Sequence, residues 1–171
     1  SPARPARGPG GGRVADEADS ANRREILADI DLRHQKLISQ LDLRQHAEFD
    51  RRQQELKSLG GQLQFPCSAA DRAALLAYGE LMSSAIGAEV LRQTGLQVNL
   101  LDARQWLRAT VGAAYTPLSV HCSSEAEPEL ETRLAALGQL HITQGFIVSG
   151  PKNETCLLGR GGSDTSAACF A

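Results

Sequence analysis

The pattern of apolar and polar positions divides the chain into a helical first half and a second half in which short strands alternate with helices. Residues 21–59 contain no Gly or Pro and carry one apolar stripe, which thins after Leu41. This spacing predicts amphipathic helices, and the thinning argues against a sustained coiled coil. We therefore expect a pair of helices that pack on the domain by one face and end at Gly60-Gly61.

The sharpest helix signal begins at Ser68. Pro66 precedes it, and Ser68-x-x-Asp71 has the pattern of a capping box with Asp in place of Glu. The predicted helix runs to about Gln93, with Gly95 just beyond its end. One face of this helix is predicted to join the core through Leu75, Tyr78, Met82, Ala85 and Ile86.

Glu80 lies on another face of the same predicted helix, beside Ser83, Ser84 and Gly87 at helical spacing. Small neighbours allow a ligand or a second segment of chain to come close to the carboxylate, which makes Glu80 a candidate binding residue. The alternative is a solvated glutamate on the surface.

In the second half, residues 140–149 give the best strand signal in the chain, which predicts one nearly continuous and buried strand. Strong turn chemistry follows at 149–153. Because helices alternate with strands, the fold class is predicted to be an α/β sandwich. The other expected elements are a strand at 97–101, a helical turn at 102–108, a loop at 112–127, a helix at 128–137 and a strand at 154–158.

The first 20 residues are mostly Pro, Gly, Ala and Arg, with hardly any apolar bulk. Such a segment buries too little surface to offset the entropy of ordering it. We expect residues 1–20 to be a disordered low-complexity segment. The remaining 21–171 then form one domain, with a helical part at 21–95 and a part that carries the site at 96–171.

Composition narrows the function classes. A net charge of −2 gives no general attraction to nucleic acid or to an anionic membrane, and an aromatic content of 4% argues against a base-stacking platform. The longest apolar runs fall far short of the roughly 20 residues that cross a membrane. We expect no nucleic acid and no membrane among the partners.

The four cysteines form no CxxC pair and no regular framework, and the chain shows no secretory signal. Reduced thiols in the cytoplasm are the simplest interpretation. The adjacent His121 and Cys122 lack further ligands at metal spacing, so no metal site is predicted.

The candidate site is the stretch that ends the sequence, which indicates a strand, a tight glycine turn and the first turns of a helix. Gly159, Gly161 and Gly162 permit positive φ and let a ligand approach the backbone. Ser163 is the predicted N-cap of the helix. The N–H groups and the positive end of the helix dipole then point into the turn, which suits an anion.

Two opposite charges stand in this turn. Arg160 offers a planar fork that grips a carboxylate or a phosphate, and Asp164 brings a negative charge to the same place. The combination suits a small zwitterion that carries a carboxylate and an ammonium group. The alternative is a local salt bridge between Arg160 and Asp164.

Four segments with these features stand in order within residues 78–167: Tyr78-Gly-Glu80-Leu-Met-Ser-Ser84, Leu101-Asp-Ala-Arg104, Ile142-Thr-Gln-Gly-Phe-Ile147 and Leu158-Gly-Arg-Gly-Gly-Ser-Asp-Thr-Ser-Ala167. Together they resemble the aspartokinases of the amino-acid kinase family. The resemblance implies a three-layer α/β/α sandwich of the amino-acid (carbamate) kinase type, incomplete at both ends. It also implies phosphoryl transfer from ATP, with Mg²⁺, to the side-chain carboxylate of L-aspartate, which opens lysine, threonine and methionine synthesis.

The same resemblance assigns roles to residues. It implies that Glu80 orients the ammonium group of aspartate and that Phe146 forms a wall of the pocket. Arg160 matches the arginine that grips a substrate carboxylate, and Asp164 matches the acid that completes the charge network. The turn Gly161, Gly162 and Ser163 matches the backbone that lines the substrate.

The sequence also departs from the family pattern. The Lys-Phe-Gly-Gly-Thr-Ser turn that handles the transferring phosphate and the Thr-Asp-x-x-Gly segment that holds the nucleotide do not occur in it. We therefore expect a fragment of the catalytic domain that is inactive alone. One alternative is a non-catalytic aspartate-binding or regulatory protein, another is a helical interaction module at 21–59, and assembly into a homo-oligomer stays open.

Overall fold

The computed structural model describes residues 10–64, 66–110, 112, 115–122 and 128–170, with backbone only for 10–19 and for Pro128. The chain divides into two compact units, residues 1–40 and residues 41–171. Each unit is described by itself.

The first unit contains one long helix, α1 (Gly10–Gln40). It begins within the segment that was expected to be disordered, and residues 1–9 of that segment lie outside the described part. Pro9 is the last proline before Pro66, and the residues after it include the helix formers Ala15, Glu17 and Ala18. The sequence from Gly10 onward is therefore compatible with a helix.

The second unit begins with two helices that pack along each other, α2 (Ala47–Gln62) and α3 (Ala69–Gln93). The predicted capping box of α3 is confirmed. The Ser68 hydroxyl accepts the Asp71 N–H at 3.1 Å, and the Asp71 carboxylate accepts the Ser68 N–H at 3.1 Å. After α3 the chain reverses through Gly95, which has a φ of +91°.

The strands of the second unit are short and pair two by two. Parallel β1 and β4 form one sheet, antiparallel β2 and β3 form another, and antiparallel β5 and β6 form a hairpin. Isolated bridges join Arg108 to Ser149 and Val120 to Leu158, which links the last two sheets. The elements after α3 are β1 (Asn99–Leu101), η1 (Ala103–Gln105), β2 (Ala109–Thr110), β3 (His121–Cys122), α4 (Pro128–Leu137), β4 (His141–Thr143), β5 (Ile147–Ser149), β6 (Thr155–Leu157) and α5 (Gly162–Phe170).

Two expectations about this region are wrong. The apolar run 140–149 is two strands in different sheets, β4 and β5, because residues 144–146 leave the extended conformation and Phe146 has a φ of +68°. The expected loop at 112–127 contains the short strand β3, which pairs with β2 through its backbone. Residues 111, 113–114 and 123–127 lie outside the described part.

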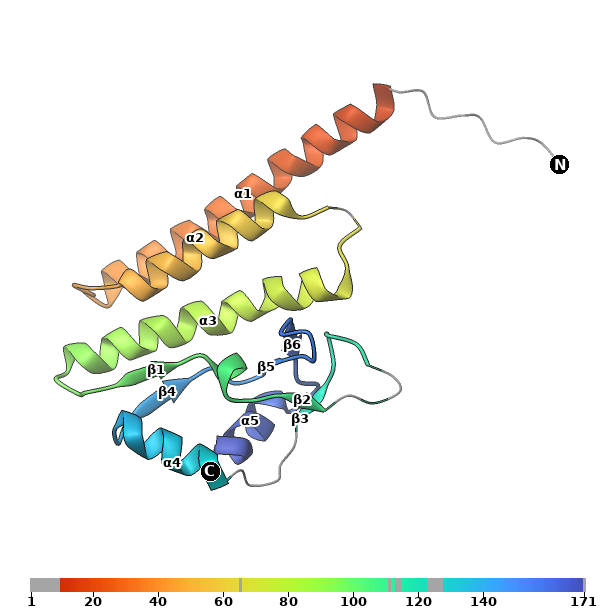
Figure 1. The fold of residues 1–171 in the computed structure, drawn as a ribbon. Helices are drawn as coiled ribbons and strands as arrows, with labels where there is room; N and C mark the ends of the chain where they lie inside the picture. The colour runs from red at the N-terminus through yellow and green to blue at the C-terminus, as the bar shows by residue number, and fades with distance from the viewer. Residues whose placement is uncertain (1–9, 65, 111, 113–114, 123–127, 171) are drawn as a thin grey trace. The chain divides into compact units, whose positions relative to one another are not determined.

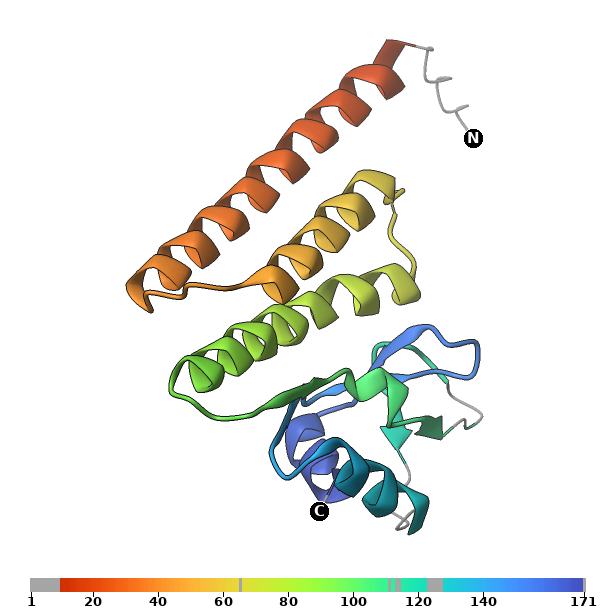
Figure 2. The same cartoon turned by 60° about the vertical axis from the view of Figure 1, so that its left-hand side comes forward.

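The β5–β6 hairpin has helices on both sides, which gives the unit an α/β/α layering (Figures 1 and 2). The paired residues Ile147 and Leu157 belong to one core cluster with Leu81 of α3. The next pair, Val148 and Cys156, belongs to another cluster against which α5 packs through its last residues. Alternation along the strands therefore directs one face to α3 and the other to α5.

By length and composition α3 could cross a membrane, because it has 25 residues and contains an 18-residue window with a mean hydropathy of 1.2 and no more than two charged residues. Core helices pass the same test. The buried residues Ala73, Ala77 and Leu81 of α3 pack with Ile147 and Leu157 of the hairpin. This contact makes α3 the inner helical layer of the second unit.

A partly buried ionic network joins η1 to α2. The Asp102 carboxylate accepts hydrogen bonds from Arg52 at 3.2 Å and from Arg104 at 2.6 and 2.8 Å. Arg104 also donates to the Thr155 hydroxyl of β6 at 3.0 Å. Burial alone would raise the pKa of Asp102, but the hydrogen bonds and positive charge of Arg104 hold it below the usual 3.8.

This lowered pKa predicts a loss of stability in acid. A carboxyl group whose pKa is lower in the folded state contributes its stability above its unfolded pKa and loses it as the pH falls through the folded value. We expect the free energy of unfolding to fall below about pH 4 and Asp102→Asn to flatten that slope. Urea unfolding between about pH 2 and 6 measures it. Asp29→Asn, in an exposed pair with Arg33, should leave the slope unchanged, and equal slopes in all three proteins would contradict the prediction.

Candidate functional site

A pocket of about 560 Å³ lies between the end of β6 and the first turn of α5. The predicted glycine turn forms its floor, with Gly161 at a φ of +76° and the Gly162 N–H donating to the Gly159 carbonyl at 2.9 Å. Ten residues from three segments line the pocket: Leu118, Ser119, Phe146, Leu158, Gly159, Arg160, Gly161, Gly162, Ser163 and Asp164.

The helix behind this turn begins two residues earlier than predicted, since an N-cap at Ser163 would make Asp164 the first helical residue. α5 starts at Gly162, so Ser163 lies inside the first turn and is not the N-cap. The Gly161 carbonyl accepts the Thr165 N–H at 3.0 Å. Within the described part of the chain, the N–H groups of Ser163 and Asp164 have no acceptor. Such N–H groups in the first turn of a helix have no partner within the helix, and here they lie at the edge of the pocket.

The two charges of the turn are not bound to each other. Arg160 and Asp164 are both exposed, and neither side chain forms a hydrogen bond or an ion pair with any residue that the structure describes. The alternative of a local salt bridge is therefore wrong for this conformation. Both charges remain available to a ligand that carries the complementary pair.

Glu80 lies in α3, half-buried, and does not line the pocket. Its carboxylate makes no hydrogen bond to the described residues. The small residues near it have a packing role, since the buried Ser84 accepts a hydrogen bond from Gln144, and a Cβ on Gly87 would meet Ile142 at 3.0 Å. The segment 142–144 therefore packs on α3 at Ser84 and Gly87, and these contacts do not include the Glu80 carboxylate.

Gln144 connects α3 to the pocket and was not among the predicted site residues. Its amide group donates to the Ser84 hydroxyl at 2.7 Å and accepts the Ala103 N–H at 2.9 Å, and only 2% of the residue is exposed. The next residue, Gly145, touches the first turn of α5, because a Cβ there would lie 2.9 Å from the Ser163 hydroxyl. The sequence signal that could have identified Gln144 is its position as an amide side chain within a segment expected to be a buried strand.

Phe146 is held in a strained conformation beside the turn. Its φ of +68° is unusual for a residue with a Cβ and persists only where the surroundings enforce it. The Phe146 N–H donates to the Ser166 hydroxyl at 3.0 Å, and that hydroxyl donates to the Gly162 carbonyl at 2.8 Å. The side chain packs against both core clusters, which fixes the wall of the pocket.

Gly162 is the closest contact between these parts, and we expect Gly162→Ala to destabilise the second unit by about 1–3 kcal/mol. An added Cβ would lie 2.7 Å from the Leu158 Cβ and 2.9 Å from the Phe146 ring. Gly61 is the matched control, because it is helical and has nothing within 4 Å of an added Cβ. Gly61→Ala should stabilise by up to about 1 kcal/mol. Urea denaturation of both variants checks the pair, and similar values would contradict the packing.

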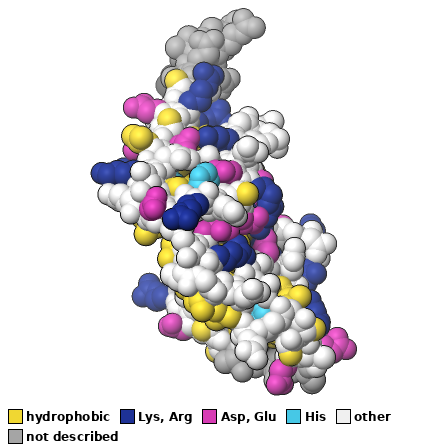
Figure 3. All heavy atoms as spheres, turned by 90° about the vertical axis from the view of Figure 1, so that its left-hand side faces the viewer, with side chains coloured by type: hydrophobic (Ala, Val, Ile, Leu, Met, Phe, Trp, Pro, Cys, Tyr) yellow, Lys and Arg dark blue, Asp and Glu magenta, His cyan; other side chains and the backbone are white. Residues whose placement is uncertain are grey.

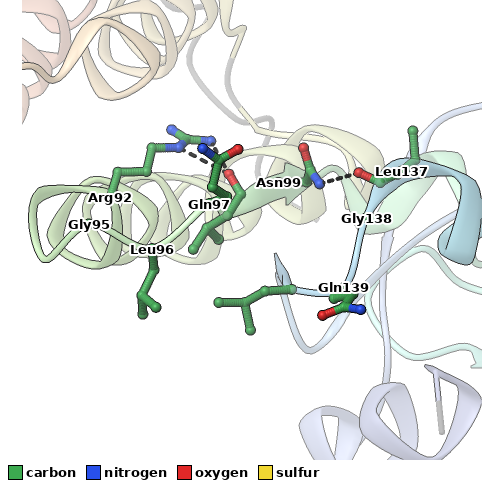
Figure 4. Close-up of a pocket in the computed structure, with 10 residues that line it drawn as sticks. Arg92, Gly95, Leu96, Gln97, Asn99, Leu137, Gly138 and Gln139 are labelled. Atoms are coloured by element: carbon green, nitrogen blue, oxygen red, sulfur yellow. Dashed lines mark hydrogen bonds between the residues drawn. The ribbon is translucent and has the colours of Figure 1, made fainter.

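A larger pocket, about 830 Å³, lies between the C-terminal end of α3 and the segment 137–140 (Figure 4). Two of its polar side chains are bound to the backbone: Arg92 donates to the Val98 carbonyl, and Asn99 donates to the Leu137 carbonyl. None of the predicted site residues lines it. Of these two pockets, the smaller one at the glycine turn is the one that predicted site residues line.

The charges elsewhere do not suggest a polyanion site. Figure 3 shows one face of the molecule, on which basic and acidic side chains are interspersed. No basic stripe is seen on this face.

Comparison with known proteins gives consistent results. The amino acid kinase family model matches residues 8–171. The chain is 38% identical over 106 residues to the lysine-sensitive aspartokinase 3 of Escherichia coli, and 30% identical over 155 residues to an aspartokinase of Chlamydia pneumoniae. These alignments cover 57% and 87% of this chain.

The fold is similar to that of Escherichia coli aspartokinase III in a crystal structure with aspartate and ADP in the R-state. The TM-score is 0.73 at 30% identity, over 90% of this chain and 36% of that chain. The alignments cover 21% of the Escherichia coli curated relative and 32% of the Chlamydia relative. The chain thus spans about a third or less of the length of these proteins.

Proposed function

This chain belongs to the amino acid kinase family, and on that premise we propose that it is the part of an aspartate kinase that binds the amino acid. The reaction is phosphoryl transfer from MgATP to the side-chain carboxylate of L-aspartate, giving 4-phospho-L-aspartate, the first step of lysine, threonine and methionine synthesis. The observation that carries this proposal is the presence of Arg160 and Asp164 in one pocket without a bond between them.

A small amino acid fits the chemistry of this pocket. The Arg160 guanidinium can hold a carboxylate through two parallel hydrogen bonds, and the N–H groups of Ser163 and Asp164 add neutral donors. The Asp164 carboxylate is the counter-charge for an ammonium group. The Phe146 ring limits the size of the ligand from one side.

We include Glu80 in the proposed site because α3, the helix that carries it, is linked to the wall of the pocket. It has no partner among the described residues, and one helical turn later Ser84 is tied to Gln144, which leads into the wall of the pocket. We assign to Glu80 the orientation of the substrate ammonium group. With opposite charges placed around the amino acid, these residues would act by positioning and charge neutralisation.

ATP and Mg²⁺ enter the proposal through the family and through the ADP in the Escherichia coli relative. The described residues contain no group of three or more His, Cys, Asp or Glu that could hold a metal ion. The pocket offers a single guanidinium, which matches a carboxylate better than a triphosphate. We therefore assign no nucleotide contact within this chain. We place the protein in the cytoplasm.

The test is an assay that traps acyl phosphate with hydroxylamine. The protein is supplied with MgATP and, in turn, with L-aspartate, L-glutamate and N-acetyl-L-glutamate, and binding of each amino acid is measured by calorimetry. A product with aspartate alone supports the aspartate kinase. Because the chain spans about a third or less of its relatives, the assay is repeated with the protein from the complete reading frame.

The same measurements separate the alternatives. Aspartate binding without a product from either protein would favour a non-catalytic aspartate-binding or regulatory protein. Failure to bind aspartate, with the fold intact by circular dichroism, would refute both.

A further inference from the structure

Two cysteine side chains meet where β3 packs against α5. The Cys122 and Cys169 sulfur atoms lie 3.0 Å apart, although the residues are separated by 47 positions. Both residues are partly exposed. The other two thiols are elsewhere, since Cys67 precedes the cap of α3 and the buried Cys156 contacts the Tyr115 hydroxyl at 3.1 Å.

The two elements that carry this pair also shape the pocket at the glycine turn. α5 begins with Gly162 in the pocket and reaches Cys169 near its other end. β3 follows Leu118 and Ser119, which line the same pocket, and Val120, which bridges to Leu158. A covalent bond between the thiols would therefore join β3 and α5, two elements that adjoin the lining of the pocket.

We propose that Cys122 and Cys169 are a redox-sensitive pair, which forms a reversible disulfide between β3 and α5 when the protein meets a small disulfide oxidant. This inference rests on the geometry of the thiols and not on the proposed function. It adds a regulatory modification site to the second unit.

The reaction is thiol–disulfide exchange with a small disulfide such as oxidised glutathione. One cysteine, as thiolate, attacks the small disulfide, forms a mixed disulfide and releases one glutathione thiolate. The second cysteine then attacks the protein sulfur and releases the second glutathione. Two protein thiols lose two electrons and two protons, and one small disulfide is reduced to two thiols. Burial and the neighbouring Cys169 thiol raise the pKa of Cys122 to about 12, so the exchange is expected to be slow at neutral pH.

The experiment treats the 171-residue protein with oxidised glutathione, denatures it so that the buried Cys156 is accessible, alkylates the remaining thiols and maps the peptides by mass spectrometry. We expect a monomer two hydrogens lighter, a cross-linked peptide pair containing Cys122 and Cys169, and alkylation of Cys67 and Cys156. Dithiothreitol should reverse the change. The bond restricts the unfolded chain, so the midpoint of thermal unfolding should rise by roughly 4 °C or more.

Matched variants sharpen the result. Cys67→Ser should form the same cross-link, whereas Cys122→Ser and Cys169→Ser should not. The proposal is overturned if the wild-type protein keeps both thiols open to alkylation, stops at glutathione adducts, links two copies, or forms the bond without a higher midpoint. The peptide map of the wild-type protein tests the proposal directly, so the test does not depend on whether any variant folds.

Discussion

Arg160→Ala is expected to weaken L-aspartate binding by roughly 30- to 1000-fold, which corresponds to about 2–4 kcal/mol. A guanidinium that holds a carboxylate makes charge-assisted hydrogen bonds in pairs, and alanine removes both. Arg160 is exposed and has no bonded partner within the described ranges. Its loss should therefore change the free energy of unfolding by no more than about 0.5 kcal/mol.

Calorimetric titration with aspartate and urea denaturation, run on the same preparations, measure both quantities. Arg72→Ala is the matched control, because Arg72 is an exposed arginine of α3 that does not line the pocket. Arg160→Lys should retain charge but lose the planar fork, and its affinity should fall between those of the wild-type protein and Arg160→Ala. Unchanged affinity in Arg160→Ala would exclude a substrate carboxylate at this position.

Elements encoded by local signals could be predicted from the sequence. The Ser68–Asp71 capping box starts α3, and Pro128 with Gly138 brackets α4. The glycine turn at 159–162 places its residues in one pocket as expected. In each case a few neighbouring residues determine the backbone, so periodicity and turn chemistry are sufficient.

Features set by distant contacts could not be predicted. The local pattern of 140–149 predicts one strand, yet Gln144 bonds to Ser84 and Ala103, each about 40 or more positions away, and the strand is interrupted there. Phe146 has a positive φ, a conformation that phenylalanine usually avoids, so the residue type gave no indication of it. α5 starts at Gly162, where the backbone lies close to Leu158 and Phe146, while local preference predicted Ser163 as the N-cap.

The candidate site shows the same division. Residue types predicted a place for a zwitterion, and the structure shows that Arg160 and Asp164 are not paired with each other. Whether a pair of neighbouring opposite charges bonds internally depends on backbone geometry, which the sequence does not specify. The role of Glu80 stays a prediction, since its carboxylate lies on α3 outside the lining of the pocket.

The second large effect is expected in the core between α3 and the hairpin, where Leu81→Ala should destabilise the second unit by about 2–5 kcal/mol. Only 1% of Leu81 is exposed, and it packs in one cluster with Ile147 and Leu157. Such a loss is a large share of the roughly 5–15 kcal/mol that stabilises a typical domain. Leu76 on the same helix is 58% exposed, and Leu76→Ala should cost less than about 1 kcal/mol.

Urea denaturation followed by the fluorescence of Trp106, the only tryptophan, measures these differences. The Trp106 ring lies 4.3 Å from the Arg133 guanidinium of α4, so the signal reports on packing outside α3. The double variant Leu81→Ala with Ile147→Ala should lose less than the sum of the single variants by at least about 0.5 kcal/mol, because both shorten side chains in the same cluster. Additive losses, or equal costs for Leu81→Ala and Leu76→Ala, would mean that α3 does not pack on the hairpin through Leu81 and Ile147.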